Sequence, residues 1–326
     1  EDFLPAKRSA SLAPAIRPAI RPAIRKASFS GAIVPVALAD KEHRWPTEKI
    51  DLSFLQAFDG EMKLVSEALV YDGVELAKSV LNATLAGGIL RANSLTGELF
   101  GGRLKGIATA YSAPVPRLKG SISLANADFA KAEQTYRGAS AATGKMNFRM
   151  TFDASGRSVA HLIAGLNGEG SAELMKISVA PGAEKGASGP IVGLLSGLNN
   201  LVGLAGGRAG DGLADLSGSF AVQRGVARSQ DIQFVSNVGE GKAEGFADLV
   251  KWRTKLGGDI RLSKNVFSKL LSGTTGFELV VPFRIEGKLD EPDVVIDTGK
   301  LPGKALKIPG ALLRKSGDIL NRILPR

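Results

Sequence analysis

The chain has 326 residues, 44% of them hydrophobic, so it is long enough to bury a sizeable core. It contains no cysteine, which excludes disulfides, thiolate chemistry and cysteine metal sites. The net charge of +10 resides in the two ends, because residues 51–299 carry 26 basic and 26 acidic side chains. A surface that follows a phosphate backbone needs basic residues on the folded body, so we expect no nucleic-acid partner.

Residues 1–50 are predicted to form a Pro/Arg-rich linker that is extended or disordered. The stretch APAIRPAIRPAIRKA repeats the unit PAIR three times. Proline at every fourth residue blocks a helix and removes backbone donors that a sheet needs. A solvated tether and a spacer whose arginines contact anionic headgroups both fit this composition.

Residues 51–299 are predicted to form a series of antiparallel hairpins. The tetrapeptide RLKG occurs at Arg103 and again fourteen residues later at Arg117, which fits one strand plus a turn. Turn signals at Asp72-Gly73 and Gly87-Gly88 separate further strand patterns. After Gly144, apolar and polar residues alternate strictly, which predicts a sheet with one apolar and one polar face.

Short helices are predicted over residues 128–134 and 158–166, and a second group of strands begins near Leu213. Pro282 lies inside an alternating stretch and removes a backbone donor, so we predict an edge position for that strand. The uncharged run 187–207 is long enough to span a bilayer, but its glycines and two asparagines favour a helix on a surface.

The sequence offers no catalytic constellation, so we expect no enzyme activity, no metal and no cofactor. Its two histidines, His43 and His161, have no metal-ligand spacing around them. The stretch GASAATGK at residues 138–145 has one residue too many for a phosphate-binding loop and is followed by a strand pattern.

Residues 300–326 are predicted to form a basic amphipathic helix. Apolar residues recur at helical spacing and basic residues lie between them, a pattern typical of helices at an anionic membrane surface. An ordinary helix covering the end of the sheet is the alternative. The predicted membrane-contacting residues are Leu312, Leu313, Arg314, Lys315, Ile319, Leu320, Arg322, Ile323 and Leu324.

A long meander with an apolar face must hide that face, and the sequence predicts too few helices to cover it. We therefore predict a mainly β fold: a long incurved antiparallel β-sheet forming a groove or trough, with a few short helices and the C-terminal amphipathic helix. Glycine-rich bends favour such curling. A closed core, in which these apolar side chains cover one another, is the alternative.

Four segments of the body resemble the C-terminal region of AsmA-like proteins: GELFGGRLKG at 97–106, LNGEGSAEL at 166–174, GKAEGFADL at 241–249 and PFRIEGKLDEPDVVID at 282–297. The resemblance covers residues 51–299. It implies an incurved sheet with a hydrophobic groove, as in bridge-like lipid transfer proteins, and no catalytic residues. It also implies a bacterial periplasmic location, with an inner-membrane anchor in an N-terminal segment absent from this chain.

The function that we expect is that of a lipid-binding or lipid-transfer module contributing to outer-membrane lipid homeostasis. Its partners would be a phospholipid or other acyl lipid, an anionic membrane surface and envelope proteins. The alternatives are an assembly factor for outer-membrane β-proteins and a purely structural scaffold. The predicted groove lining is Ile122, Leu124, Met146, Phe148, Met150, Phe152, Phe220, Val222, Ile232, Phe234, Phe277, Leu279, Val281, Phe283 and Ile285.

Overall fold

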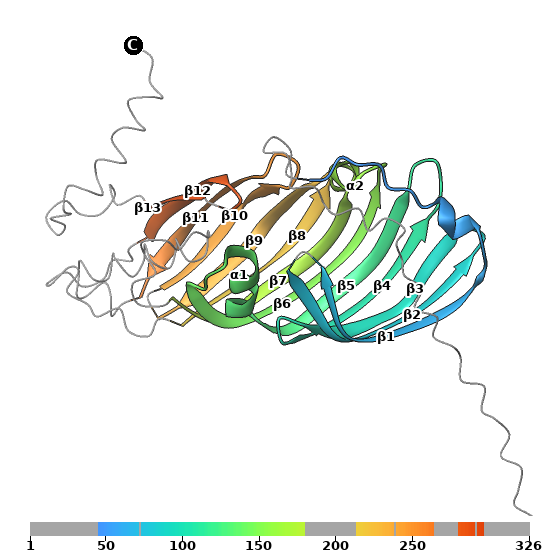
Figure 1. Cartoon of the computed structure of the whole chain (residues 1–326). Helices are drawn as coiled ribbons and strands as arrows, with labels where there is room; N and C mark the ends of the chain where they lie inside the picture. Colours follow the sequence, from blue (N-terminus) through green and yellow to red (C-terminus); the bar gives the residue numbers. More distant parts are fainter. Residues whose placement is uncertain are drawn as a thin grey trace, which may run out of the picture.

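The computed structural model describes residues 45–71, 73–179, 213–237, 239–263, 280–290 and 292–296. Within them, thirteen antiparallel strands form one sheet in chain order (Figure 1). The strands are β1 (Gly60–Tyr71), β2 (Val74–Ala86), β3 (Ile89–Leu99), β4 (Gly102–Tyr111), β5 (Arg117–Asp128), β6 (Ala142–Ser155), β7 (Asn167–Val179), β8 (Ala214–Gln223), β9 (Val226–Ser236), β10 (Gly239–Asp248), β11 (Arg253–Leu262), β12 (Val280–Lys288) and β13 (Pro292–Ile296). The helices of these residues are η1 (Ser53–Gln56), α1 (Phe129–Arg137) and α2 (Val159–Ala164).

The first hairpin turns lie where the sequence predicts them. Tyr71 pairs with Val74, so β1 and β2 form a hairpin, and Gly73 between them has a φ of 76°. Gly87 and Gly88 join β2 to β3 with φ angles of 56° and 73°, a left-handed conformation that glycine adopts without a steric penalty. Because each tight turn returns the chain beside its predecessor, successive hairpins produce a meander.

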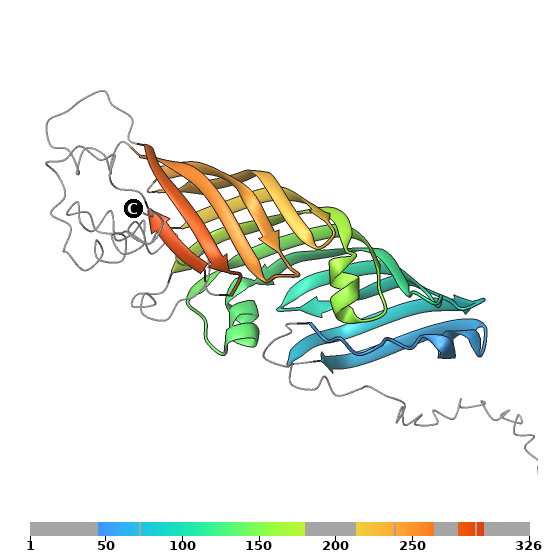
Figure 2. The ribbon, with the colours of Figure 1, turned by 90° about the horizontal axis from the view of Figure 1, so that it is seen from above.

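The sheet bends along its length, so the prediction of an incurved β-sheet is confirmed. Figure 2 shows that β1 and β2 at one end, and β12 and β13 at the other, turn toward the side that carries α1. Phe129 of α1 packs against the buried apolar residues, so the apolar face is the inside of the bend. The two RLKG copies lie on the neighbouring strands β4 and β5.

Both predicted short helices are present, and each begins at a side chain that caps it. The Asp128 carboxylate accepts a hydrogen bond from the Lys131 amide at the start of α1. Ser158 does the same for the His161 amide at the start of α2. The uncharged run 187–207 and the predicted C-terminal helix lie outside the described residues.

The prediction that Pro282 lies on an edge strand is wrong, because β12 lies between β11 and β13. Pro282 pairs with Asp259 of β11, whereas the described pairing with β13 begins one residue later, at Phe283. Within the described residues, that side of β12 has no strand pairing at Pro282. Pro282 thus lies in an inner strand, at the end of the described pairing with β13.

Residues 45–58 run along the rim formed by α2 and the turns of several hairpins (Figure 1). We call this segment the rim strap. The Trp45 indole donates to the Leu249 carbonyl at 2.7 Å and meets the Trp252 ring edge to face, with centroids 5.6 Å apart. Further along, the Ile50 amide donates to the Arg157 carbonyl at 2.8 Å. The strap thus contacts the segments that follow β4, β6 and β10, since the Ser112 hydroxyl also donates to the Leu52 carbonyl at 2.8 Å. It includes the last six residues of the predicted linker.

Candidate functional site

The structure describes thirteen of the fifteen predicted lining residues, and these thirteen all lie on the apolar face of the sheet. The other two, Phe277 and Leu279, lie outside the described residues. All the predicted membrane-contacting residues also lie outside them. Six of the thirteen are buried: Leu124, Val222, Phe234, Val281, Phe283 and Ile285. The other seven are partly exposed: Ile122, Met146, Phe148, Met150, Phe152, Phe220 and Ile232. The predicted lining therefore divides into a covered part and an open part.

Four of the six buried residues, Phe234, Val281, Phe283 and Ile285, belong to a cluster that extends from β6 to β12, and Leu124 belongs to a second, smaller cluster. Ile260, with no exposed surface, and Val281, with 1% exposed, pack in the larger cluster with Phe234, Phe283 and Ile285. Side chains covered by their own protein offer no surface to a ligand. On these strands the apolar face behaves as a closed core, which is the alternative that the sequence left open.

Of the seven partly exposed residues, Ile232 and Met146 pack against the buried clusters. We call the other five, Ile122, Phe148, Met150, Phe152 and Phe220 on β5, β6 and β8, the open strip. Cross-strand pairing places Ile122 opposite Met150, and Gly170 of β7 lies between Met150 and Phe220. Phe148 and Phe220 stack with ring centroids 5.9 Å apart. Three members of the strip, Met150, Phe152 and Phe220, belong to neither buried cluster of the described residues.

Two glycines allow the aromatic rings of the open strip to lie flat on the sheet. A Cβ atom at Gly170 would come within 2.6 Å of Cζ of Phe220, and one at Gly120 within 2.8 Å of Cζ of Phe152. Both distances are too short for real carbon contacts, so each ring occupies the space that a side chain would fill. The strip is consequently a shallow apolar floor.

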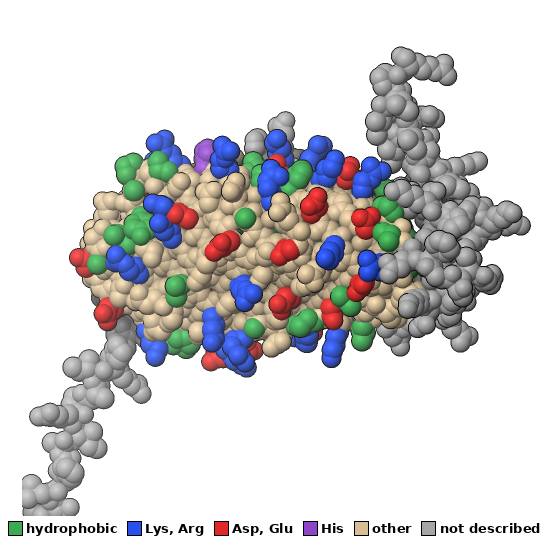
Figure 3. Space-filling model, turned by 180° about the vertical axis from the view of Figure 1, so that it is seen from behind, with side chains coloured by type: hydrophobic (Ala, Val, Ile, Leu, Met, Phe, Trp, Pro, Cys, Tyr) green, Lys and Arg blue, Asp and Glu red, His purple; other side chains and the backbone are tan. Residues whose placement is uncertain are grey.

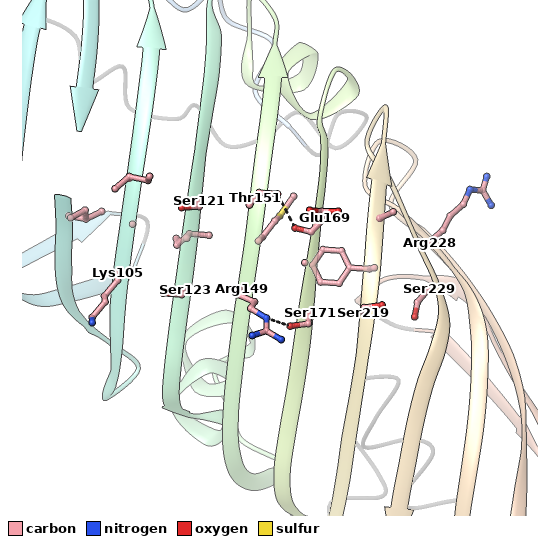
Figure 4. Close-up of a pocket in the computed structure, with 18 of the residues that line it drawn as sticks. Lys105, Ser121, Ser123, Arg149, Thr151, Glu169, Ser171, Ser219, Arg228 and Ser229 are labelled. Carbon is pink, nitrogen blue, oxygen red and sulfur yellow. Dashed lines mark hydrogen bonds between the residues drawn. The ribbon is translucent and has the colours of Figure 1, made fainter. Parts of the chain in front are cut away.

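The opposite face of the sheet is polar, and it is hollowed. Figure 3 shows Lys, Arg, Asp and Glu side chains scattered over it, among small polar side chains and backbone. A hollow of about 1170 Å³ lies there, lined by residues from β3 to β9, including Lys105, Arg149, Glu169 and Arg228 (Figure 4). Sequence reasoning missed this hollow, although serine and threonine at the polar positions of successive strands were a signal for it.

Hydrogen bonds hold two aspartates of the polar face in their charged form. The Arg117 guanidinium, whose Nε lies 2.8 Å from Oδ1 of Asp153, lowers the pKa of that carboxyl, with Lys119 assisting. The Ser219 hydroxyl and amide lower the pKa of Asp231 in the same way. Neither carboxyl is available as a general acid near neutral pH.

The described residues contain one serine and histidine pair, and its geometry is that of a helix cap. Oγ of Ser158 lies 2.9 Å from Nδ1 of His161 and also accepts a hydrogen bond from the His161 amide. Ser158 is buried and, among the described residues, no carboxylate contacts His161. A nucleophile must reach its substrate and its base needs an orienting group, so this pair fits a cap and not a catalytic dyad.

No group of three or more histidine or acidic side chains suited to a metal ion occurs in the described part of the chain. None of the helices in that part is long and apolar enough to cross a bilayer. Comparisons of the chain with protein-family models, with curated proteins and with solved structures find no match. The resemblance to AsmA-like proteins therefore stays a prediction.

Proposed function

We propose that the chain is a non-enzymatic lipid-binding or lipid-transfer module whose open strip holds acyl chains while the lipid headgroup stays in solvent. The observation that supports this most directly is the contrast along one apolar face, which is buried at Phe234, Ile260 and Phe283 and partly exposed at the five residues of the open strip. Soluble proteins seldom leave large contiguous apolar surface uncovered unless it meets a partner.

The chemistry of the open strip suits a flexible hydrocarbon chain. It consists of aliphatic, aromatic and thioether side chains, and the flat rings over Gly120 and Gly170 leave a surface without deep side pockets. Each CH₂ group that an acyl chain buries there contributes about 0.8 kcal/mol. Met150 adapts its shape to different chains, because its unbranched thioether has three rotatable bonds.

The proposed setting is the bacterial periplasm, and it rests on the resemblance to AsmA-like proteins. There the module would bind a phospholipid or another acyl lipid and contribute to the lipid homeostasis of the outer membrane. The basic tail, residues 300–326, would hold it at an anionic membrane surface, since each cation near such a surface contributes about 1 kcal/mol.

Photo-crosslinking tests the proposal. The delipidated full chain is mixed with a phosphatidylglycerol that carries a photoreactive acyl chain, and crosslinked peptides are mapped by mass spectrometry. We expect labels on residues of the open strip, such as Phe148 and Met150, and none on the covered Phe283. Labels confined to the tail, or spread evenly over the surface, would mean that the apolar face is only a core.

Two aspartate substitutions provide a matched comparison. Met150→Asp places a charge in the open strip, whereas Val235→Asp places the same charge on the polar face of β9, at a side chain that is 53% exposed. Desolvating a carboxylate against an acyl chain is costly, so only the first substitution should abolish the labelling. If Met150→Asp does not fold, Phe148→Ala replaces it and should reduce the labelling.

The free edge of β1 favours a second candidate function, that of an assembly factor for outer-membrane β-proteins. This strand is twelve residues long and pairs only with β2 in the described residues. Its exposed apolar side chains are Met62, Leu64, Val65, Leu69 and Val70. A long apolar edge is a template for strand addition. Under this reading a denatured outer-membrane β-protein binds the delipidated chain, and Val65→Pro abolishes the binding.

A further inference from the structure

We propose that the hollow on the polar face binds an acidic oligosaccharide, a chain of hydroxylated sugar rings that carry carboxylates. The polar side chains that line the hollow lie on the side of the sheet opposite the open strip, and Ile122, Met150 and Phe220 of the strip, at the strand positions between them, also belong to its lining. The inference rests on three properties of the hollow: its elongated shape, its unpaired cations and its hydroxyl groups.

The hollow follows two neighbouring rows of side chains that cross the strands. One row runs Lys105, Ser123, Arg149, Ser171 and Ser219, from β4 to β8 (Figure 4). The second runs Ile107, Ser121, Thr151, Glu169, Ala221 and Arg228, from β4 to β9. Strands lie about 4.8 Å apart, so five strand steps extend over roughly 24 Å. Such a site suits a chain better than a single compact molecule.

Six of the eleven residues in these two rows are serine, threonine or alanine, and the rows on either side carry charged and amide side chains. Along one border, Asp153 forms ion pairs with Arg117 and Lys119. Along the other, the Asn147 amide donates to the Glu173 carboxylate at 3.0 Å. The charged and amide groups of these borders are thus largely satisfied by one another.

The cations inside the hollow are not satisfied in this way. In the described part of the chain, Lys105, Arg149 and Arg228 form no ion pair, and of the three only Arg228 lies over an aromatic ring, with its Cζ 5.6 Å from the centroid of Phe246. Nε of Arg149 donates to the Ser171 hydroxyl at 2.7 Å, and the remaining guanidinium donors have no described partner. Lys105 and Arg149 are two strands apart on one row, so their backbones are separated by about 10 Å. Their free donors would meet two successive anionic groups of an extended ligand.

The other lining groups favour a saccharide over a purely anionic polymer such as polyphosphate. Ser121 and Ser123 make no side-chain hydrogen bond to described residues, and each hydroxyl can both donate and accept. Glu169 faces the hollow without an ion pair and can accept hydrogen bonds from sugar hydroxyls. Asp231 is a second carboxylate of the lining. The two carboxylates would repel the closely spaced charges of a phosphate chain more than uronate rings, which present hydroxyls between their charges.

Calorimetric titration of the full chain with a six-residue galacturonate oligomer tests this inference. We expect saturable binding, no heat from the neutral six-residue maltose oligomer, and weaker binding as salt increases. Arg149→Gln and Lys105→Gln should each weaken the binding about tenfold, because each removes one charge-assisted contact. Lys255→Gln is the matched control, since Lys255 is equally charged and lies on β11 outside the hollow.

Three results would overturn the inference: no binding of the galacturonate oligomer, an equal loss with Lys255→Gln, or polyphosphate binding as tightly as the oligomer. The probe carries no acyl chain, so its binding does not depend on the open strip. Phe148→Ala, at a strip residue that does not line the hollow, should leave the galacturonate titration unchanged, and Arg149→Gln should leave lipid labelling unchanged. A failure here is therefore distinguishable from a failure of the lipid proposal.

Discussion

Three phenylalanine-to-alanine substitutions test whether the apolar face is divided into a closed core and an open strip. Phe283 is 5% exposed within the buried cluster, Phe148 is partly exposed in the open strip, and Phe54 of η1 is 54% exposed. All three remove the same atoms. Differences in their cost therefore report how much of each ring the protein itself covers.

The expected magnitudes follow from burial. Phe283→Ala should lower the free energy of unfolding by about 3–5 kcal/mol, because a buried ring loses its transfer energy and leaves a cavity. Phe148→Ala should cost roughly half of that, since its ring is partly exposed and its main ring contact is the stack on Phe220. Phe54→Ala should change it by no more than about 0.5 kcal/mol.

Urea unfolding followed by far-ultraviolet circular dichroism measures these differences, and a fluorescent fatty acid measures acyl-chain binding in the same samples. We expect Phe148→Ala to weaken fatty-acid binding and Phe283→Ala to leave it unchanged below its unfolding transition. The reasoning is refuted if Phe148→Ala destabilises as much as Phe283→Ala while fatty-acid binding stays as in the unsubstituted chain. Phe148 would then be an ordinary core residue.

Two further predictions concern the rim strap and the polar face. Trp45→Ala removes the indole hydrogen bond to Leu249 and the ring contact with Trp252. It should lower the stability of the strap by about 1–3 kcal/mol and speed hydrogen exchange of the amides in residues 45–58. Unchanged amide exchange would contradict this prediction. The Arg117 hydrogen bond holds the pKa of Asp153 below the ordinary 3.8, so this contact stabilises the fold at neutral pH. That contribution to stability is lost as the pH falls through the pKa that Asp153 has in the folded state. Asp153→Asn should therefore make the free energy of unfolding depend less on pH in this acid range. An unchanged pH dependence would show that the Arg117–Asp153 pair adds no stability.

Local patterns in the sequence were sufficient to predict the strands and their order. Strict alternation from Met146 to Asp153 identifies a strand with one apolar face, and Gly87-Gly88 identifies a hairpin, because both effects act within a few residues. The helix caps Asp128 and Ser158 are equally local. A series of such hairpins leaves an antiparallel meander as the simplest arrangement.

Which apolar residues are covered was decided by tertiary structure alone. Phe148 and Phe283 have the same alternating surroundings in sequence, yet Phe283 lies in the buried cluster and Phe148 belongs to the partly exposed open strip. Coverage depends on how the sheet bends and on what packs across it, which are properties of residues far apart in the chain. The wrong prediction of an edge position for Pro282 has the same origin, because the sequence of β12 does not show that a further strand, β13, pairs with it.

The polar hollow also depends on long-range register. Lys105 and Arg149 share a row only because β4, β5 and β6 pair with the register observed, and Asn126, with a φ of 56°, lies where that register shifts in β5. The sequence by itself determined that this chain forms a two-faced antiparallel meander, because alternation and turns are encoded locally. The folded sheet alone decided which part of the apolar face stays open and which polar side chains meet, because bending and register join residues that are distant in sequence.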